Sequence, residues 1–382
     1  MSTNETIKNG RKPLKGLPDR IRDRWAGASG PQRWTVYVLL FIGALLLPSD
    51  SIGQFMSPYS DWASVLFFPI GTYVVLAIGL NVVVGQAGLL DLGYVAFFAI
   101  GGYVMALLGT KMGLNFWEIL IVGVLLSALS GIVLGGPTLR LRGDYLAIVT
   151  LGFGEIVRQT AENTDAIGGP RGIAGIPHPP SIEGVELFGV EIFKYGVLDP
   201  RPYYYLLVVL ATLIIVFVKR WEKSRVGRAW AAIREDEDAA EVMGVPTFKF
   251  KLLAFAIGAA IGGAMGVVWA GKTISINPND FLFMLSATIL AAVVLGGSGN
   301  IPGVVLGAFL VAWLPERFRG LSDYRILVFG AALVALMVFR PEGLLPSRRR
   351  RAELAEGTGG MGTLGAEVAT PESQPAAEGA AK

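Results

Sequence analysis

The chain has 382 residues, of which 53% are hydrophobic and only 16% are charged, and its mean hydropathy is +0.55. This composition is typical of a polytopic membrane protein and excludes an ordinary soluble domain. The formal net charge is only +3 and there is no cysteine, which excludes disulfides, thiolate catalysis and cysteine-based metal sites.

The two ends of the chain differ from its middle. Residues 1 to 33 carry eight Lys and Arg and lack the apolar core and cleavage site of a signal peptide, so we interpret them as a basic cytoplasmic arm near anionic headgroups. Residues 346 to 382 include the run RRRR followed by Ala, Gly, Glu, Thr and Pro. That composition can bury almost nothing and predicts a disordered cytoplasmic tail.

Residues 34 to 345 form the predicted transmembrane domain, because its apolar runs are long enough to cross about 30 Å of hydrocarbon. The fold class is an all-α polytopic membrane protein with about ten transmembrane helices. Several runs are shorter than about 17 residues, so a count of eight or re-entrant segments stay open. The predicted spans are 34–47, 62–82, 89–108, 118–136, 144–158, 203–218, 252–271, 282–297, 301–316 and 324–339.

The positions of the basic residues predict the orientation, because Lys and Arg are retained on the cytoplasmic side during insertion. Eight lie between residues 219 and 251 and five between residues 340 and 351. With ten spans and the N-terminus inside, both segments fall on the cytoplasmic side together with Arg140 and Arg142. The loop 317–325 disagrees, because it places its arginines outside.

Polar residues interrupt the apolar sequence between two predicted spans, in the stretch NVVVGQAGLLDLGY. Irregular backbone at membrane depth survives only beside protein or water. Asp91 facing lipid at a helix centre would cost roughly 2.5 to 3.5 kcal/mol. Asn81, Gln86, Asp91 and Tyr94 are therefore candidates for a translocation path. A purely structural network of hydrogen bonds at a helix junction would produce the same pattern.

A second polar group lies in the stretch GDYLAIVTLGFGE, where Thr150 and Glu155 are further candidates for the path. The same structural alternative applies to them. Glu155 and Arg158 are three residues apart, so they can pair on one face of a helix.

The longest external connection is predicted at residues 159–202. Within it, Val185 and Leu187 and then Val190 and Ile192 alternate in a way that favours a small hairpin. The connection could be a docking surface for an external protein or a simple external cap.

The longest cytoplasmic interruption, residues 219–251, contains the stretch DEDAAEVMG, which predicts a short helix from Asp236. Acidic residues occupy the first turn, where the helix dipole favours them. Gly244 suits the C′ position, and Pro246 prevents continuation. A helix of about two turns is about 12 Å long, too short to span a membrane and suited to lie along its face.

The stretch GVVWAGKT, from Gly266 to Thr273, has the letters of a phosphate-binding loop. A working loop follows a strand and opens a helix, whereas Lys272 closes an apolar helix. We interpret the match as a coincidence in which Lys272 reaches toward lipid headgroups. His178 has no carboxylate at metal-ligand spacing and is interpreted as a loop residue. We therefore expect no enzyme activity, catalytic residue, cofactor or metal.

Two sets of glycines are spaced four residues apart. This spacing aligns them on one helix face and lets a neighbouring backbone approach closely. The predicted packing glycines are Gly258, Gly262, Gly266, Gly299, Gly303 and Gly307.

The segment DAAEVMG, Asp238 to Gly244, resembles the Glu-Ala-Ala-x-x-x-Gly loop of ABC importer permeases, with Asp in place of the first Glu. A solvated amphipathic helix would look similar. Longer stretches add to the resemblance, which covers roughly residues 60 to 345 and is to the LivM-type permease of branched-chain amino-acid ABC importers. These stretches lie at 79–103, 139–159, 168–176, 227–245 and 293–308.

The resemblance implies a permease subunit in a bacterial plasma (inner) membrane, multi-pass and with both termini cytoplasmic. It implies a heterodimer with a second homologous permease, two cytoplasmic ATPase subunits, an external binding protein that delivers Leu, Ile or Val, contact with membrane lipid, and no nucleic acid. The ATPase-coupling residues that it implies are Glu237, Asp238, Ala239, Ala240, Glu241 and Gly244.

Two other functions fit parts of the pattern. Related ABC permeases for urea or short-chain amides share much of it, and nothing in the sequence selects leucine over those solutes. An ion-coupled secondary carrier, which belongs to a different class, would also present about ten spans and a few buried acids. It would need no ATPase.

Overall fold

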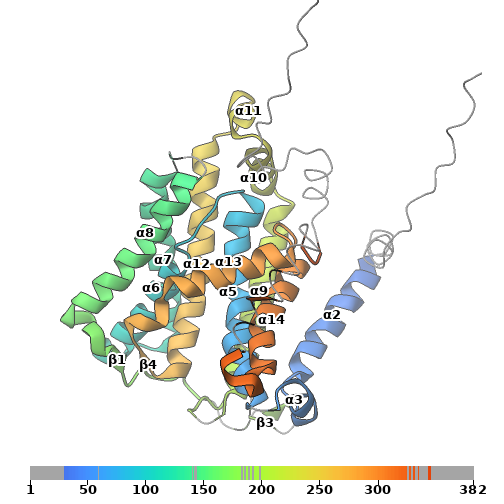
Figure 1. The fold of residues 1–382 in the computed structure, drawn as a ribbon, viewed down its shortest axis with the longest axis vertical. Coiled ribbons are helices and arrows are strands. Elements are labelled where there is room, and N and C mark those ends of the chain that lie inside the picture. The colour runs from blue at the N-terminus through green and yellow to red at the C-terminus, as the bar shows by residue number, and fades with distance from the viewer. Residues whose placement is uncertain are drawn as a thin grey trace, which may run out of the picture.

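The computed structural model describes residues 30 to 345 except 59, 140, 142–143, 182–183, 185, 188–189, 192, 198, 325–326, 328–329, 332–333 and 335–342. It is a bundle of helices (Figure 1). The predicted tail, 346–382, and nearly all of the predicted arm lie outside the described residues. The helices are α2 Gly30–Leu46, α3 Asp50–Met56, α4 Trp62–Val65, α5 Thr72–Leu80, α6 Val95–Leu107, α7 Phe116–Thr138, α8 Asp144–Asn163, α9 Arg201–Glu222, α10 Arg225–Glu235, α11 Glu237–Val242, α12 Thr247–Thr273, α13 Phe283–Gly296 and α14 Ile301–Arg317.

The bundle has two distinct ends (Figure 1). Helices α10 and α11 lie at one end, called here the α11 end; α3 and the short strands lie at the other, called the strand end. Strand β1, Ile173–Ala174, pairs antiparallel with β4, Ser275–Ile276. The predicted hairpin is present as β2, Glu186–Leu187, paired with β3, Val190–Glu191. The flanking residues Val185 and Ile192 lie outside the described part of the chain.

Among the described residues, six helical segments are long and apolar enough to cross a membrane. Of the other predicted spans, those at α2 and α14 have only 17 residues each, and α8 carries several charged side chains. The predicted tenth span lies largely outside the described residues, so the count of ten is not confirmed. The six segments are Trp62–Gln86, Val95–Met112, Phe116–Thr138, Arg201–Glu222, Thr247–Thr273 and Pro278–Gly296.

Helix α12 is the centre of the core, and its glycines let neighbouring backbones approach closely. A Cβ atom at Gly258 would lie 2.6 Å from Val83 Cγ2, and one at Gly266 would lie 2.7 Å from Gly102 N. A second face, formed by Gly263, meets α6 and α7; a Cβ there would overlap Ser127. Small residues on two faces explain how three helices pack tightly around α12.

The first long span is not a regular helix. Between α4 and α5 it contains the π-helical turn η1, Leu66–Gly71, in which Phe68 has φ −138° and ψ 123°. Pro69 explains the break, because proline lacks a backbone N–H and disfavours helical conformation in the preceding residue. After α5 the span ends in a second π-helical segment, η2, Asn81–Gln86.

Helices α13 and α14 are joined by a tight turn. Gly297 and Gly299 in this turn have φ values of 103° and 84°, which residues with a side chain rarely adopt. Gly303 and Gly307 of α14 lie against the backbone of Gly296 in α13. The prediction that Gly299 shares their helix face is wrong, because its positive φ places it in the turn before α14.

The apparent phosphate loop is part of α12. The helix continues to Thr273, so its backbone N–H groups are engaged in helical hydrogen bonds and do not form an anion-binding nest. Lys272 Nζ donates to the carbonyl of Val197 at 2.8 Å and lies 5.5 Å from the centre of the Tyr203 ring. The side chain therefore binds the connection before α9, which the prediction of headgroup contact did not include.

Candidate functional site

Helix α11 forms where the sequence predicts it. Asp236 ends α10 and starts α11, with φ −157° and ψ 112°. Its carboxylate accepts from the N–H of Ala239 at 2.9 Å, which satisfies one of the free donors at the helix start. Gly244 follows the helix with φ 85°, the left-handed conformation expected at C′.

One side of α11 is anchored to the bundle. Ala240 is only 5% exposed, so a larger side chain has no room there. Glu237 Oε1 lies 2.5 Å from Lys251 Nζ in α12. The same ammonium group donates to the carbonyl of Leu139 at 3.1 Å. The short helix is thus tied to α12 and to the end of α7.

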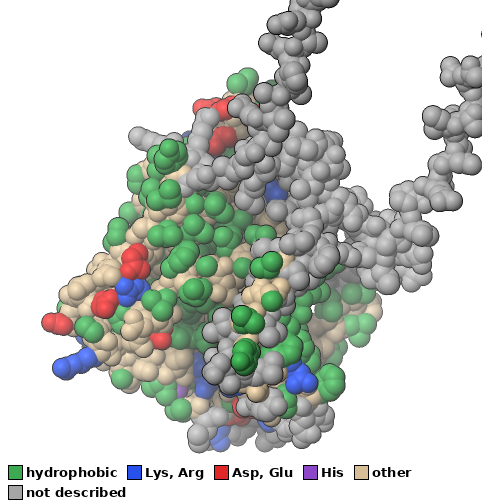
Figure 2. Space-filling model, viewed as in Figure 1, with side chains coloured by type: hydrophobic (Ala, Val, Ile, Leu, Met, Phe, Trp, Pro, Cys, Tyr) green, Lys and Arg blue, Asp and Glu red, His purple; other side chains and the backbone are tan. Residues whose placement is uncertain are grey.

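The other side of α11 is open. Val242 and Met243 are 86% and 82% exposed, and Figure 2 shows acidic side chains beside hydrophobic ones at this end. A shallow groove of about 330 Å³ lies beside them, lined by Glu241 and residues 244 to 249. Exposed apolar side chains next to acidic ones are typical of a protein docking surface.

Helix α10 precedes α11 and was not predicted as a separate helix. Trp230 is fully buried, and its Nε1 donates to the carbonyl of Phe250 at 2.7 Å. Arg234 donates from its guanidinium to the carbonyl of Gly85. The sequence does carry a signal for α10, because Ser224 caps it by accepting from the N–H of Val226 at 3.1 Å.

Asn81 and Gln86, two of the predicted path residues, lie in η2. Asn81 is fully buried, and its Oδ1 accepts from the N–H of Gly299 at 2.8 Å. Within the described residues, Asn81 Nδ2 and both polar side-chain atoms of Gln86 are buried without a hydrogen-bond partner. Buried polar groups are nearly always paired, so these atoms are exceptions in the core that call for an explanation.

Asp91, Tyr94 and Thr150 hold the segment between η2 and α6. Asp91 Oδ1 accepts from the N–H of Gly93 at 2.9 Å, and Thr150 Oγ1 accepts from the N–H of Leu92 at 3.0 Å. Tyr94 donates to the carbonyl of Gly258 at 2.9 Å. These contacts form a hydrogen-bonding network at a helix junction, which is the structural alternative that the sequence left open. Asp91 Oδ2 is buried and has no partner among the described atoms.

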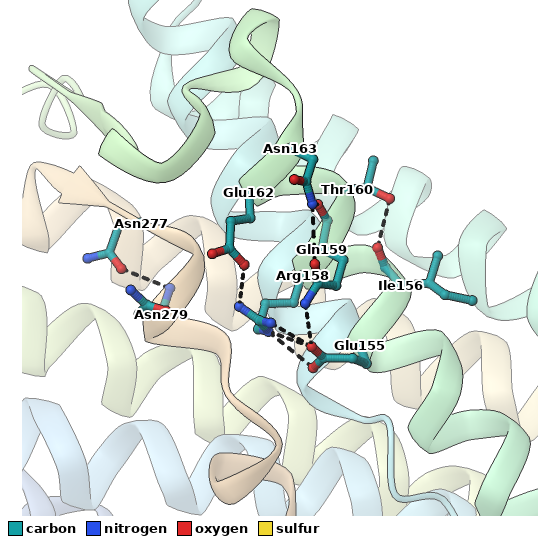
Figure 3. A network of polar contacts seen from close by, with 9 residues as sticks. All are labelled: Glu155, Ile156, Arg158, Gln159, Thr160, Glu162, Asn163, Asn277 and Asn279. Atoms are coloured by element: carbon teal, nitrogen blue, oxygen red, sulfur yellow. Dashed lines mark hydrogen bonds and ion pairs between the residues drawn. The ribbon is translucent and has the colours of Figure 1, made fainter.

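The predicted pair Glu155 and Arg158 is present and belongs to a larger network on α8 (Figure 3). Arg158 lies 2.5 Å from Glu155 and 2.7 Å from Glu162. Gln159 donates to Glu155 at 3.0 Å. The network shows that a membrane-length helix carries two carboxylates and one guanidinium in its last three turns.

The exposed face of α8 changes character along its length. It is apolar near the α11 end, at Tyr145 and Ile148, and polar near the strand end, at Gln159 and Thr160. Helix α7, in contrast, exposes only apolar side chains from Ile121 to Val133. Lipid can cover the α7 face, but charged and amide groups at membrane depth need water or protein beside them.

At the strand end, one histidine joins three segments. His178 Nδ1 lies 2.6 Å from the hydroxyl of Tyr203 in α9 and 3.0 Å from the carbonyl of Gly271 in α12. The sequence predicted His178 only as a loop residue and gave no sign of these contacts, because the residues around it in the chain do not indicate them. In the described part of the chain, no three His, Cys, Asp or Glu side chains gather into a metal site.

A helical bundle with apolar membrane-length segments, a broken span and an anchored short helix at one end defines a polytopic membrane permease. The family model described as "Branched-chain amino acid transport system / permease component" matches residues 64–339. The chain belongs to this family.

Named relatives agree with the family. The chain is 43% identical over 304 residues to the high-affinity branched-chain amino acid transport system permease protein LivM of Escherichia coli, covering 75% of this chain and 70% of that protein. A probable LivM of Methanocaldococcus jannaschii is 28% identical over 250 residues, which is 60% of this chain and 69% of that one. The LivH permease of Escherichia coli is 31% identical over 158 residues, 41% of this chain and 50% of that protein. No solved structure matches the chain.

Proposed function

We propose that this chain is the membrane-spanning permease subunit of an ABC importer that carries the branched-chain amino acids Leu, Ile and Val. The observation that carries the proposal is α11, a short helix with a buried anchored side and an exposed apolar tip, in a chain 43% identical to a permease named for this transport. ATP hydrolysis would occur in separate ATPase subunits that dock on α11.

Three further partners complete the proposed transporter. The similarity to LivH-type permeases supports a homologous second permease as the other half of a heterodimer. An external binding protein would deliver the amino acid to the connection 159–202, which contacts between Lys272 and Val197 and between His178 and Tyr203 hold against the bundle. The apolar face of α7 would contact membrane lipid.

We propose that the α11 end is cytoplasmic, with both termini on that side of a bacterial inner membrane. The support is charge, because segment 219–251 carries eight Lys and Arg, and such residues are retained on the cytoplasmic side during insertion. Arg319, from the loop that disagreed with this rule, donates to Ser60 at 2.6 Å. This contact supports placing Arg319 on the same side of the membrane as the connection after α3, which the proposal puts outside.

The polar half of the α8 face would border the water-filled path between the two permeases. Glu155 lies on it, whereas Thr150 is buried behind it. Asn81 and Gln86 would line the path nearer the α11 end, because their buried polar atoms are unpaired among the described residues. Asp91 and Tyr94 would position the segment between η2 and α6 that lies behind the path.

Reconstitution tests the proposed function. The chain, a second permease, two ATPases and the binding protein are placed in liposomes, and uptake of radiolabelled leucine, isoleucine and valine is measured. We expect uptake that requires ATP and the binding protein and survives collapse of ion gradients. Uptake driven by an ion gradient without ATPases would favour the secondary carrier, and transport of urea or acetamide in place of leucine would favour the amide permease.

Two substitutions test the ATPase-coupling residues. Ala240→Arg places a long charged side chain where only 5% of the residue is exposed. Gly244→Leu forces a left-handed conformation that costs about 1 to 2 kcal/mol, which is relieved by shifting the end of α11. We expect both to abolish uptake while membrane insertion and binding-protein association persist. Normal uptake in both variants would remove α11 from the coupling pathway.

Cysteine labelling tests the path along α8, because the natural chain has no cysteine to replace first. Ile156 and Leu125 are matched at 64% and 62% exposed, and lie about 10 and 14 Å along their helices from the strand end. In the assembled transporter, a membrane-impermeant maleimide should label Ile156→Cys much faster than Leu125→Cys. Equal rates would mean that the α8 face meets lipid.

A further inference from the structure

The Arg234 side chain contacts the end of the broken span Trp62–Gln86 and the turn that follows it. It donates to the carbonyl of Gly85, near the end of η2. That carbonyl lies in the last turn of its helix, where backbone acceptors need partners from outside the helix. Gly88, three residues further, has φ 75°, and a Cβ there would lie 2.9 Å from Arg234 Cγ. The turn after η2 is therefore shaped around this side chain.

Gly85 lies against the second interruption in the membrane domain, the turn between α13 and α14. A Cβ at Gly85 would overlap Asn81 Oδ1 and would lie 2.5 Å from the backbone nitrogen of Gly299. The Asn81 carboxamide accepts from that same nitrogen at 2.8 Å. The π-helical η2 and the α13–α14 turn are thus in direct contact, and the Asn81 side chain bonds one to the other.

The last described residues hold the α13–α14 turn in place. Asn300 Nδ2 donates to the carbonyl of Leu345 at 2.7 Å, and the N–H of Leu344 donates to the carbonyl of Leu295 at 2.8 Å. Two interrupted helices and the end of the membrane domain therefore meet at one place, which Arg234 contacts from the α11 end.

Arg234 is also closely connected to α11. Only Glu235 and Asp236 separate it from the start of the helix, and Asp236 caps α11 directly. The buried Trp230, bonded to the carbonyl of Phe250, fixes α10 against α12. A displacement of α11 that passes through this short connection would move or break the contact between Arg234 and Gly85.

We propose that Arg234 is a positioning residue that carries movement of α11 to the junction of η2 with the α13–α14 turn. At this junction Asn81 Nδ2 and the Gln86 amide have no hydrogen-bond partner among the described residues. The proposal rests on the proposed function, because it assumes that ATPase subunits move α11. Arg234 itself contacts neither ATPase nor solute in this scheme. Its loss should separate ATP hydrolysis from transport, leaving the assembly of the complex intact.

The test uses the complete reconstituted transporter with the Arg234→Ala variant. We expect the ATPase subunits to copurify and to hydrolyse ATP, while leucine uptake falls roughly tenfold, so that the ATP consumed per leucine rises by the same factor. Arg234→Lys keeps a donor for the Gly85 carbonyl and should recover part of the uptake. Arg228→Ala, which removes an exposed arginine from the same helix, should behave like the natural chain.

Gly88→Val provides a second variant if Arg234→Ala fails to assemble. The valine side chain would displace Arg234 from the Gly85 carbonyl while leaving Arg234 itself unchanged. It should therefore raise the ATP consumed per leucine in the same way. An unchanged ratio of ATP to leucine in assembled variants, or a parallel loss of hydrolysis and uptake, would overturn the role of Arg234. A natural complex that hydrolyses ATP but imports no leucine would instead contradict the proposed function.

Discussion

Replacing Val242 and Met243 together with aspartate is expected to abolish uptake by removing the ATPase subunits from the complex. Both side chains are almost fully exposed, at 86% and 82%, so the change should leave the fold intact. In a docked complex they would be buried, and an unpaired carboxylate in such an interface is costly. We expect ATPase binding to weaken roughly 100-fold, measured by copurification and by binding of purified ATPase to the permease in nanodiscs.

Met243→Leu is the matched control, because it keeps an apolar side chain of similar volume. It should retain ATPase binding and uptake. Undiminished ATPase binding by the double aspartate variant would show that the tip of α11 is not the docking surface. The anchored side of the helix would then have no mechanical role.

A valine at Gly101 is expected to prevent the membrane domain from folding. A Cβ at this position would overlap the Gly263 carbonyl oxygen and lie 2.7 Å from the Gly263 Cα, and backbone cannot rotate away as a side chain can. Helices α6 and α12 would have to separate along their contact in the core. Overpacking costs about 1 to 3 kcal/mol where side chains can adjust, and more is expected here. The measurement is the folded fraction recovered in detergent by size-exclusion chromatography.

Gly152→Val in α8 is the comparison for this prediction. In the part of the chain that the structure describes, no atom outside its own helix lies within 4 Å of a Cβ at Gly152, so the same substitution should leave the folded fraction unchanged. Equal recovery of the two variants would mean that close contact between α6 and α12 does not limit folding.

Features encoded over short distances could be predicted from the sequence. The apolar runs predict the membrane helices, because burial in hydrocarbon depends on local composition. Asp236, Gly244 and Pro246 predict α11, because caps and helix stops act within one or two turns. The pairing of Glu155 with Arg158 follows from their separation on one helix.

Contacts between distant segments could not be predicted in the same way. Asn81 meets Gly299, and His178 meets Tyr203 and Gly271, across separations that no local pattern encodes. Gly299 shares the spacing of Gly303 and Gly307, yet its backbone conformation places it in a turn. Spacing describes a helix face only where the helix exists, and the neighbouring segments decide where it ends.

The sequence by itself determined that this protein crosses a membrane through apolar helices and carries a short capped helix in its longest basic connection. Hydrophobic length and capping chemistry are properties of neighbouring residues. Only the tertiary structure decided that Arg234 contacts Gly85 and that η2 contacts the α13–α14 turn. It also decided that Asn81 Nδ2 and the Gln86 amide are buried without a partner in the described part of the chain. Those facts depend on how helices pack, which brings together residues more than a hundred positions apart.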